Sequence, residues 1–476
     1  MLDQISRDDG TALLCGAGLE AEEASQWLEE AQTRVFGNSE LSTEARDCGR
    51  LCQTARAWLE GLPLKSERDQ KQEQAGSLLV RETAGLCWRF TRTWRKELFE
   101  ESERIAGPFP RLEALAESAS ELCPGIYPCE QELQVEQKKL LRDKDGLELH
   151  QGILFAQWFS DPEHGQRMIR NMRQPTPRAL ELQEEVLKTG KANLEYARVE
   201  IENGTGTVFF SNPMYLNAED DTTLEPSETA VDLVLLHPEV KVGVLRGDPV
   251  SHPKYSGRRL FSSGINLTRL YQGTQSYLFY LTRELGLVNK LFRGHCGAEW
   301  LGEEIEHGHE IPWIAVVEGF AIGGGCQLLL VMDYVLAESG AYLNLPARKE
   351  GIIPGCANLR LPRMTGKRLA SQAILFDRQF PVDAPESQSL VNEICSRNDV
   401  ERQLRQCLQS VTGSGLVSAA GNRKSLRAGE EPLEVFRTYM AQYAYEQAFC
   451  HLSPQLVQNL EFHWKSRESK NQKMPI

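Results

Sequence analysis

The chain has 476 residues, a formal net charge of −14 and 41% hydrophobic residues. Its length allows two or three domains with buried cores, and its hydrophobic content excludes wholesale disorder. The acidic balance argues against nucleic acid or an anionic membrane as the main partner. No apolar run reaches the roughly 18 residues of a membrane span. Because the first residues lack the basic and apolar regions of a secretory signal, we expect a cytoplasmic protein.

Twelve cysteines are scattered along the chain, and no two of them form a CxxC pair. In a chain without a secretory signal, this pattern predicts reduced thiols rather than a disulfide framework. The best metal-ligating candidate is His307-Gly308-His309, but its polar, glycine-containing surroundings are more typical of a solvated loop. We therefore expect no metal site.

Residues 1–192 are predicted to form a helical N-terminal domain. The segment is rich in Glu, Gln, Leu and Ala, and apolar residues recur at helical spacing, as in Leu78, Leu79, Leu86 and Phe90. Proline and glycine pairs separate the helices. No motif in residues 1–140 indicates what this domain does.

Residues 193–400 change to an α/β pattern. Alternating apolar and polar residues flank Asn203-Gly204, which predicts a β-hairpin because both residues accept positive φ. A helix capped by Ser227 is expected next. Strands and helices then alternate, which predicts parallel strands; the expected elements are a strand at 240–247, a helix at 276–292, a strand at 313–319, a helix at 326–333 and a strand at 334–339. Residues 401–476 read as a C-terminal helical region.

Two glycine-containing loops, Phe261–Asn266 and Gly319–Gln327, each lie between a strand and a helix. Glycines there let a ligand approach the backbone, and amide N–H groups at a helix start lack intrahelical acceptors. Together, the loops suit an oxyanion hole for a thioester enolate or tetrahedral adduct. Tight turns without a ligand are an equally open interpretation. Neither a dinucleotide fingerprint nor a P-loop motif is present.

The order of these segments resembles the crotonase (enoyl-CoA hydratase/isomerase) superfamily. The resemblance rests on the hairpin ending in SNPMYLNAED, the strand VKVGVLRG, the loop FSSGIN, the segment WIAVVEGFAIGGGCQLLLVMDYVLA and the segment LPARKEGIIPGCANLRLPRMTG. It implies an α/β fold, a crotonase-like spiral of ββα units. It also implies that the N–H groups of Ile265 and Gly324 form the oxyanion hole.

Two positions depart from the hydratase pattern. Hydratases of the superfamily carry glutamates where this chain has Gln327 and Ala347. An amide and a methyl group cannot shuttle protons at neutral pH. Hydration of an enoyl thioester by paired glutamates is therefore disfavoured, although the oxyanion-hole loops remain.

One branch of the superfamily combines these departures with a long helical N-terminal extension. It comprises the cofactor-independent (3,5-dihydroxyphenyl)acetyl-CoA dioxygenases of dihydroxyphenylglycine formation in antibiotic biosynthesis. This chain resembles that branch in LHQGILFAQWFSDPEHGQRMIRNMRQPTPRALEL, HPKYSGRRLFSSGIN and FRTYMAQYAYEQA. The resemblance implies O2 as co-substrate, CoA only as part of the substrate, no other cofactor, and a trimer or hexamer.

The resemblance also implies site residues. Glu219, Arg283 and Gln327 are expected to bind the ring hydroxyls, and His252 is a weaker candidate. Without the resemblance, a solvated carboxylate, a surface ion pair, a helix cap and a loop histidine would be the simpler interpretations.

A short basic cluster, Lys254, Arg258 and Arg259, lies next to the first glycine loop and is a candidate for binding CoA phosphates. A solvated turn explains it equally well. The general base is not indicated, with Glu219 the nearest carboxylate. Three functions stay open: the dioxygenase, another crotonase-fold enzyme such as a thioesterase or isomerase, and a non-catalytic acyl-CoA binder.

Overall fold

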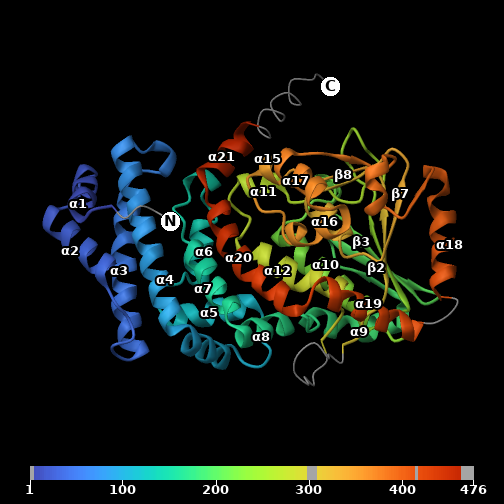
Figure 1. Cartoon of the computed structure of the whole chain (residues 1–476), viewed down its shortest axis with the longest axis horizontal. Helices are drawn as coiled ribbons and strands as arrows, with labels where there is room; N and C mark the ends of the chain where they lie inside the picture. The colour runs from blue at the N-terminus through green and yellow to red at the C-terminus, as the bar shows by residue number, and fades with distance from the viewer. Residues whose placement is uncertain (1–4, 297–307, 413–415, 463–476) are drawn as a thin grey trace. The chain divides into compact units, whose positions relative to one another are not determined.

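The computed structural model describes residues 5–296, 308–412 and 416–462. The chain divides into two compact units (Figure 1). Unit 1 comprises residues 1–168, 270–277 and 440–458, and unit 2 comprises residues 169–269, 278–439 and 459–476. Both units are discontinuous in sequence, whereas the predicted domains are three continuous stretches; those domain bounds stay a prediction.

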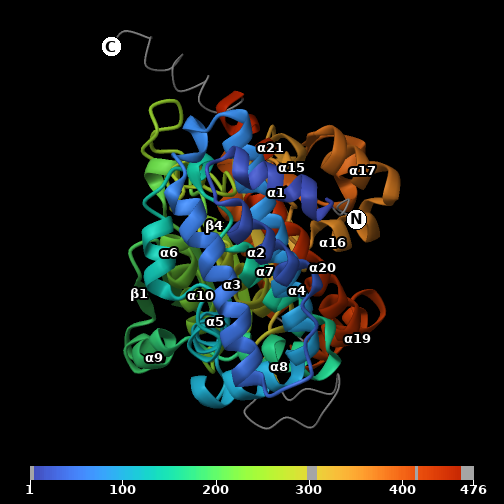
Figure 2. The same ribbon diagram turned by 90° about the vertical axis from the view of Figure 1, so that its left-hand side faces the viewer.

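The first part of the chain is helical. Its helices are α1 (Arg7–Gly16), α2 (Ala21–Thr33), α3 (Leu41–Gly61), α4 (Gln70–Ala106), α5 (Leu112–Leu122), α6 (Glu130–Glu136), α7 (Leu149–Ser160), α8 (Pro162–Met172) and α9 (Pro177–Thr189). Asp69 and Gln72 form a capping box that starts the long helix α4. The predicted apolar face of α4 is buried, and Figure 2 shows α3 lying along this helix.

Unit 2 contains a seven-stranded sheet in the order β1-β2-β3-β4-β5-β7-β10. Its strands are β1 (Lys191–Asn193), β2 (Ala197–Glu202), β3 (Thr205–Phe210), β4 (Val242–Gly247), β5 (Trp313–Val317), β7 (Tyr334–Glu338) and β10 (Glu393–Cys395). β2 and β3 form the predicted hairpin, with φ of 51° at Asn203 and 76° at Gly204. From β3 onward neighbouring strands are parallel, as predicted. A second sheet joins β6 (Phe320–Ile322), β8 (Tyr342–Asn344) and β9 (Phe380–Pro381).

The remaining helices lie between these strands or after them in the chain. They are α10 (Asp221–Leu236), α11 (Leu267–Tyr271), α12 (Leu278–Thr282), α13 (Asn289–Arg293), α14 (Gly324–Leu329), α15 (Ala347–Glu350), α16 (Ala357–Thr365), α17 (Lys367–Phe376), α18 (Val400–Thr412), α19 (Leu416–Glu430), α20 (Leu433–His451) and α21 (Pro454–Leu460). Figure 1 shows α10 running along β2 and β3, which it contacts.

Two predicted helices differ in the structure. Ser227 was expected to cap a helix, but it lies inside α10 and donates to the Thr223 carbonyl. The true cap is Asp220, whose side chain accepts from Thr222 N–H, so the helix begins before Pro226. The single helix expected at 276–292 is interrupted by a π-helical turn, η4 (Arg283–Val288).

The central strands are apolar on both faces, because helices and strands cover them on each side. Val242, Val244, Ile314, Val316 and Leu336 form one buried cluster. Such continuous burial is typical of parallel strands and explains their mainly hydrophobic sequence. The exception is the buried Arg246 of β4, which pairs with Glu318 at 2.8 Å. β5 ends just before the second glycine loop, and residues 320–322 of that loop form β6. Residues 248–260 separate β4 from the first loop, which is anchored where Phe261 N–H donates to the Glu318 carbonyl at 3.1 Å.

Candidate functional site

The two glycine loops lie against each other. Ile322 N–H donates to the Ser262 carbonyl at 3.0 Å, which links the loops. Gly264 has a φ of 81°, and a Cβ on it would lie 2.6 Å from the Ile322 carbonyl oxygen and 3.0 Å from Gly324 N. Only glycine fits this left-handed position and this close approach.

Each loop offers one backbone N–H group. Gly324 is the first residue of α14, so its N–H has no intrahelical acceptor. Glu219 N–H donates to the Gly264 carbonyl, and Asn266 N–H donates to the Glu219 carbonyl. The intervening Ile265 N–H therefore points to the other side of that extended segment. Within the described residues, neither Ile265 N–H nor Gly324 N–H has a hydrogen-bond acceptor.

Arg283 lies behind these loops and connects the predicted polar residues. Its Nε donates to Glu219 Oε2 at 2.6 Å, and its Nη2 donates to Glu219 Oε1 at 3.2 Å and to the Gly324 carbonyl at 2.8 Å. Its Nη1 donates to Glu284 Oε1 at 2.7 Å and to Gln327 Oε1 at 3.0 Å. These five bonds match the five N–H donors of a guanidinium. Arg283 therefore holds the other polar groups in place.

The same bonds set the orientation of Gln327. Because its Oε1 accepts from Arg283, its Nε2 amide group is turned away from the guanidinium. No described residue accepts a hydrogen bond from that Nε2. The two N–H groups of Gln327 Nε2 therefore have no acceptor among the described residues.

The π-helical turn η4 positions the guanidinium. Arg283 and Glu284 are consecutive, yet both side chains are buried and joined to each other. A Cβ on Gly286 would lie 2.7 Å from the Glu228 carboxylate, so the turn packs closely on α10. The Lys290 ammonium forms ion pairs with both Glu228 and Asp232, at 2.7 and 2.8 Å. π-helical turns often occur at functional sites.

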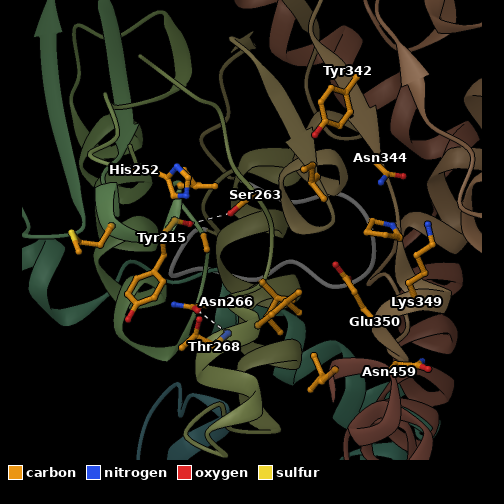
Figure 3. A pocket seen from close by; sticks show the side chains of 18 of the residues that line it. Tyr215, His252, Ser263, Asn266, Thr268, Tyr342, Asn344, Lys349, Glu350 and Asn459 are labelled. Atoms are coloured by element: carbon orange, nitrogen blue, oxygen red, sulfur yellow. Dashed lines mark hydrogen bonds between the residues drawn. The ribbon is translucent and has the colours of Figure 1, made fainter. Parts of the chain in front are cut away.

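A cavity of about 770 Å³ opens next to the first loop (Figure 3). Its lining includes Ile265 and His252 among the predicted site residues. The His252 ring is tilted against Tyr255, and its Nδ1 accepts from Lys254 N–H at 3.2 Å. Other lining residues are Tyr215, Asn266, Ile322, Tyr342, Asn344 and Asn459.

The basic cluster has a different arrangement from the one suggested by its sequence. Arg258 pairs with Glu338 at 3.0 Å, and Arg259 pairs with Asp248 at 3.2 Å. The Lys254 ammonium lies 5.0 Å from the centre of the Tyr255 ring. None of the three cations lines the cavity. Their role in binding CoA phosphates stays a prediction.

Several polar residues of the cavity were not singled out from the sequence, among them Asn344, Lys349 and Glu350. Asn344 Oδ1 is buried, and no described residue donates a hydrogen bond to it. Lys349 and Glu350 both lie on the short helix α15. Burial, and then the nearby Asp377 carboxylate, raise the pKa of Glu350 to about 7. In the sequence, the lysine and the acid look like an ordinary solvated helix face.

Neither hydratase position carries an acid. Gln327 lies beside Arg283, and Ala347 is buried at the start of α15. Over the described ranges, no group of three His, Cys, Asp or Glu side chains is arranged to hold a metal ion. His307 of the sequence candidate lies outside the described residues. No helix in the described part of the chain is long and apolar enough to cross a bilayer.

Comparison with known proteins identifies relatives of this chain. Residues 200–455 match the enoyl-CoA hydratase/isomerase family. The chain is 39% identical over 392 residues to the (3,5-dihydroxyphenyl)acetyl-CoA 1,2-dioxygenase of Amycolatopsis orientalis, covering 82% of this chain and 89% of that protein. It is 26% identical to a mitochondrial enoyl-CoA hydratase of Pongo abelii, over 50% of this chain and 76% of that protein. A solved enoyl-CoA hydratase from Mycobacterium avium subsp. paratuberculosis K-10 superposes with a TM-score of 0.46 at 21% identity, over 60% of this chain and 99% of that one.

Proposed function

Because the chain belongs to the enoyl-CoA hydratase/isomerase family, whose mixed α/β core it combines with a helical front and a helical tail, we propose that it is a metal- and cofactor-independent dioxygenase. Its substrates would be (3,5-dihydroxyphenyl)acetyl-CoA and O2, and its products 3,5-dihydroxyphenylglyoxylate and CoA. Similarity to a dioxygenase of that substrate, over most of both chains, carries the proposal.

The first requirement of this reaction is a stabilised enolate. The substrate Cα lies between an aryl ring and a thioester carbonyl, so its proton is acidic for a carbon acid. The N–H groups of Ile265 and Gly324, held next to each other by the two loops, would donate to the thioester oxygen. Such donors stabilise the charge that develops on this oxygen in the enolate.

The second requirement is a held aryl ring. Gln327 Nε2 is free to donate to a phenolic oxygen, and the Glu219 carboxylate can accept from a phenol O–H group. Arg283 fixes the side chains of Glu219 and Gln327 through its own hydrogen bonds and therefore acts as a positioning residue for both. A ring held in this way would keep the Cα close to the two N–H groups.

The later steps use the electron-rich enolate itself. The enolate reduces O2 and forms a C–O bond at Cα, which gives a peroxide. The terminal peroxide oxygen attacks the thioester carbonyl, and CoA leaves as the thiolate. Cleavage of the O–O bond with loss of the second Cα proton gives the arylglyoxylate. Both oxygen atoms of O2 enter the product, and no external reductant is needed.

The absence of acids at Gln327 and Ala347 favours this reaction over hydration. Thioester hydrolysis, double-bond isomerisation and non-catalytic acyl-CoA binding remain the alternatives. The family resemblance also leads us to propose a homotrimer or hexamer, which light scattering coupled to gel filtration tests directly.

Oxygen uptake and CoA release, measured in parallel on chelator-treated protein with (3,5-dihydroxyphenyl)acetyl-CoA, test the proposal. We expect equimolar O2 consumption and CoA release. CoA release without O2 uptake would identify a thioesterase. Binding of the thioester without either signal would contradict the dioxygenase and favour the binding role.

A further inference from the structure

The proposed reaction needs a group that removes the Cα proton. Glu219 is poorly suited to that role, because both its carboxylate oxygens accept hydrogen bonds from the buried Arg283 guanidinium. These two bonds direct both oxygens of the carboxylate toward Arg283. Another proton acceptor must therefore face the substrate.

Glu350 occupies a suitable place. It is partly buried, it lines the cavity, and Figure 3 shows its carboxylate pointing from α15 into that cavity. A Cβ on Gly323, the residue preceding the Gly324 donor, would lie 3.8 and 4.0 Å from the two carboxylate oxygens. None of the described residues donates a hydrogen bond to this carboxylate. It is thus next to the oxyanion loop and available to a ligand.

The position on α15 is also informative. Ala347 and Glu350 are the first and last residues of this helix, three positions apart. Residues three apart on a helix lie on neighbouring parts of one face. Glu350 thus carries a carboxylate almost one helical turn after Ala347, the position where hydratases of the superfamily carry a glutamate.

We propose that Glu350 is the general base that removes the Cα proton of the thioester; this inference rests on the proposed function. The carboxylate oxygen forms an O–H bond as the Cα–H bond breaks. The C–H electron pair becomes the C=C bond of the enolate, and the carbonyl π pair moves to the oxygen held by Ile265 and Gly324. The proton passes to the departing CoA thiolate, so the regenerated carboxylate accepts the second Cα proton when the O–O bond breaks.

The charges around Glu350 suit this role. Arg348 and Lys349 flank it on α15, but they bind Asp377 at 2.6 and 3.6 Å. Asp377 is the C-cap residue of α17. Burial is the larger cause that raises the pKa of Glu350, and the negative charge of Asp377 is the second; together they raise it to about 7. A base with a pKa near the working pH combines proton affinity with a large ionised fraction.

Exchange of the Cα protons for deuterium, followed by NMR in D2O without O2, isolates the first step. We expect Glu350→Gln to slow exchange about 100-fold or more, with thioester affinity changed less than about threefold. Glu239→Gln, at an exposed carboxylate outside the cavity, is the matched control and should exchange at the wild-type rate. Exchange by Glu350→Gln at the control rate would overturn the proposal.

The wild-type protein separates this inference from the proposed function. If the exchange depends on Glu350 but no O2 is taken up when air is admitted, Glu350 is supported as the base and the proposed dioxygenase function is contradicted. A lack of exchange in the wild-type protein, with the thioester bound, would overturn both.

A second variant does not remove the carboxylate. Asp377 has a φ of 56°, which Asn also adopts readily, so Asp377→Asn should fold. Removing this negative charge should lower the apparent pKa of the exchange rate by about 1 unit. A purely structural role for Glu350 would leave that pH profile in place, and an unchanged or raised apparent pKa would contradict the proposal.

Discussion

Replacement of Arg283 by lysine tests whether this side chain organises the site. Lysine keeps the charge but has one nitrogen in place of a planar fork, so it cannot serve Glu219, Gln327 and the Gly324 carbonyl together. Losing two or three buried hydrogen bonds at about 1 kcal/mol each gives a loss of about 2–3 kcal/mol in unfolding free energy. Arg283→Met leaves the buried Glu219 carboxylate without its ion-pair partner, so we expect a loss of about 3–5 kcal/mol.

Activity should fall more steeply than stability. Because Glu219 and Gln327 lose their common anchor, we expect oxygen uptake by Arg283→Lys to drop about 100-fold or more. Urea unfolding and an oxygen electrode measure the two effects. Arg402→Lys is the control, since Arg402 makes an exposed ion pair with Asp399 that contributes about 0–1 kcal/mol. If Arg283→Lys matched this control in both assays, the organising role would be refuted.

Three further changes have defined outcomes. Gly324→Ala places a methyl group 2.3 Å from Glu219 Oε2, so oxygen uptake should fall about 100-fold or more, whereas Gly421→Ala, where a Cβ meets open space, should not change it. Glutamates introduced together at Gln327 and Ala347 should lower oxygen uptake, because the amide donors are lost; measurable enoyl-CoA hydration by this variant would show that the scaffold still accepts enoyl thioesters. Burial lowers the pKa of His150 from its ordinary 6.5 to about 4, so His150 is protonated in the unfolded chain at a higher pH than in the folded chain. The free energy of unfolding should therefore decrease by up to about 3 kcal/mol between pH 6.5 and 4. Urea unfolding of His150→Asn should not show this decrease.

Local chemistry made some elements predictable. The turn at Asn203-Gly204 follows from positive φ values that these two residues tolerate, and no distant contact is needed. The apolar runs of β4 and β5 likewise indicated strands buried on both faces. The loops holding Ile265 and Gly324 were identified through glycines that the structure shows to be sterically required.

Other features depend on contacts between distant segments. The family resemblance predicted Arg283 as a substrate-binding residue. Its five hydrogen bonds, which include those to the distant residues Glu219 and Gln327, use all its N–H donors. The role of Glu350 depends on Gly323 and Asp377 in the same way. The start of α10 was predicted too late because Ser227 was taken as the N-cap, whereas Asp220 caps the helix.

Turnover of (3,5-dihydroxyphenyl)acetyl-CoA under ¹⁸O2 tests the central claim most directly. The enolate mechanism places both atoms of one O2 molecule in the product. Mass spectrometry should therefore find an arylglyoxylate carrying two ¹⁸O atoms, released together with one CoA per O2 consumed. An arylacetate without ¹⁸O, or an arylglyoxylate with a single ¹⁸O atom incorporated during turnover, would contradict the mechanism.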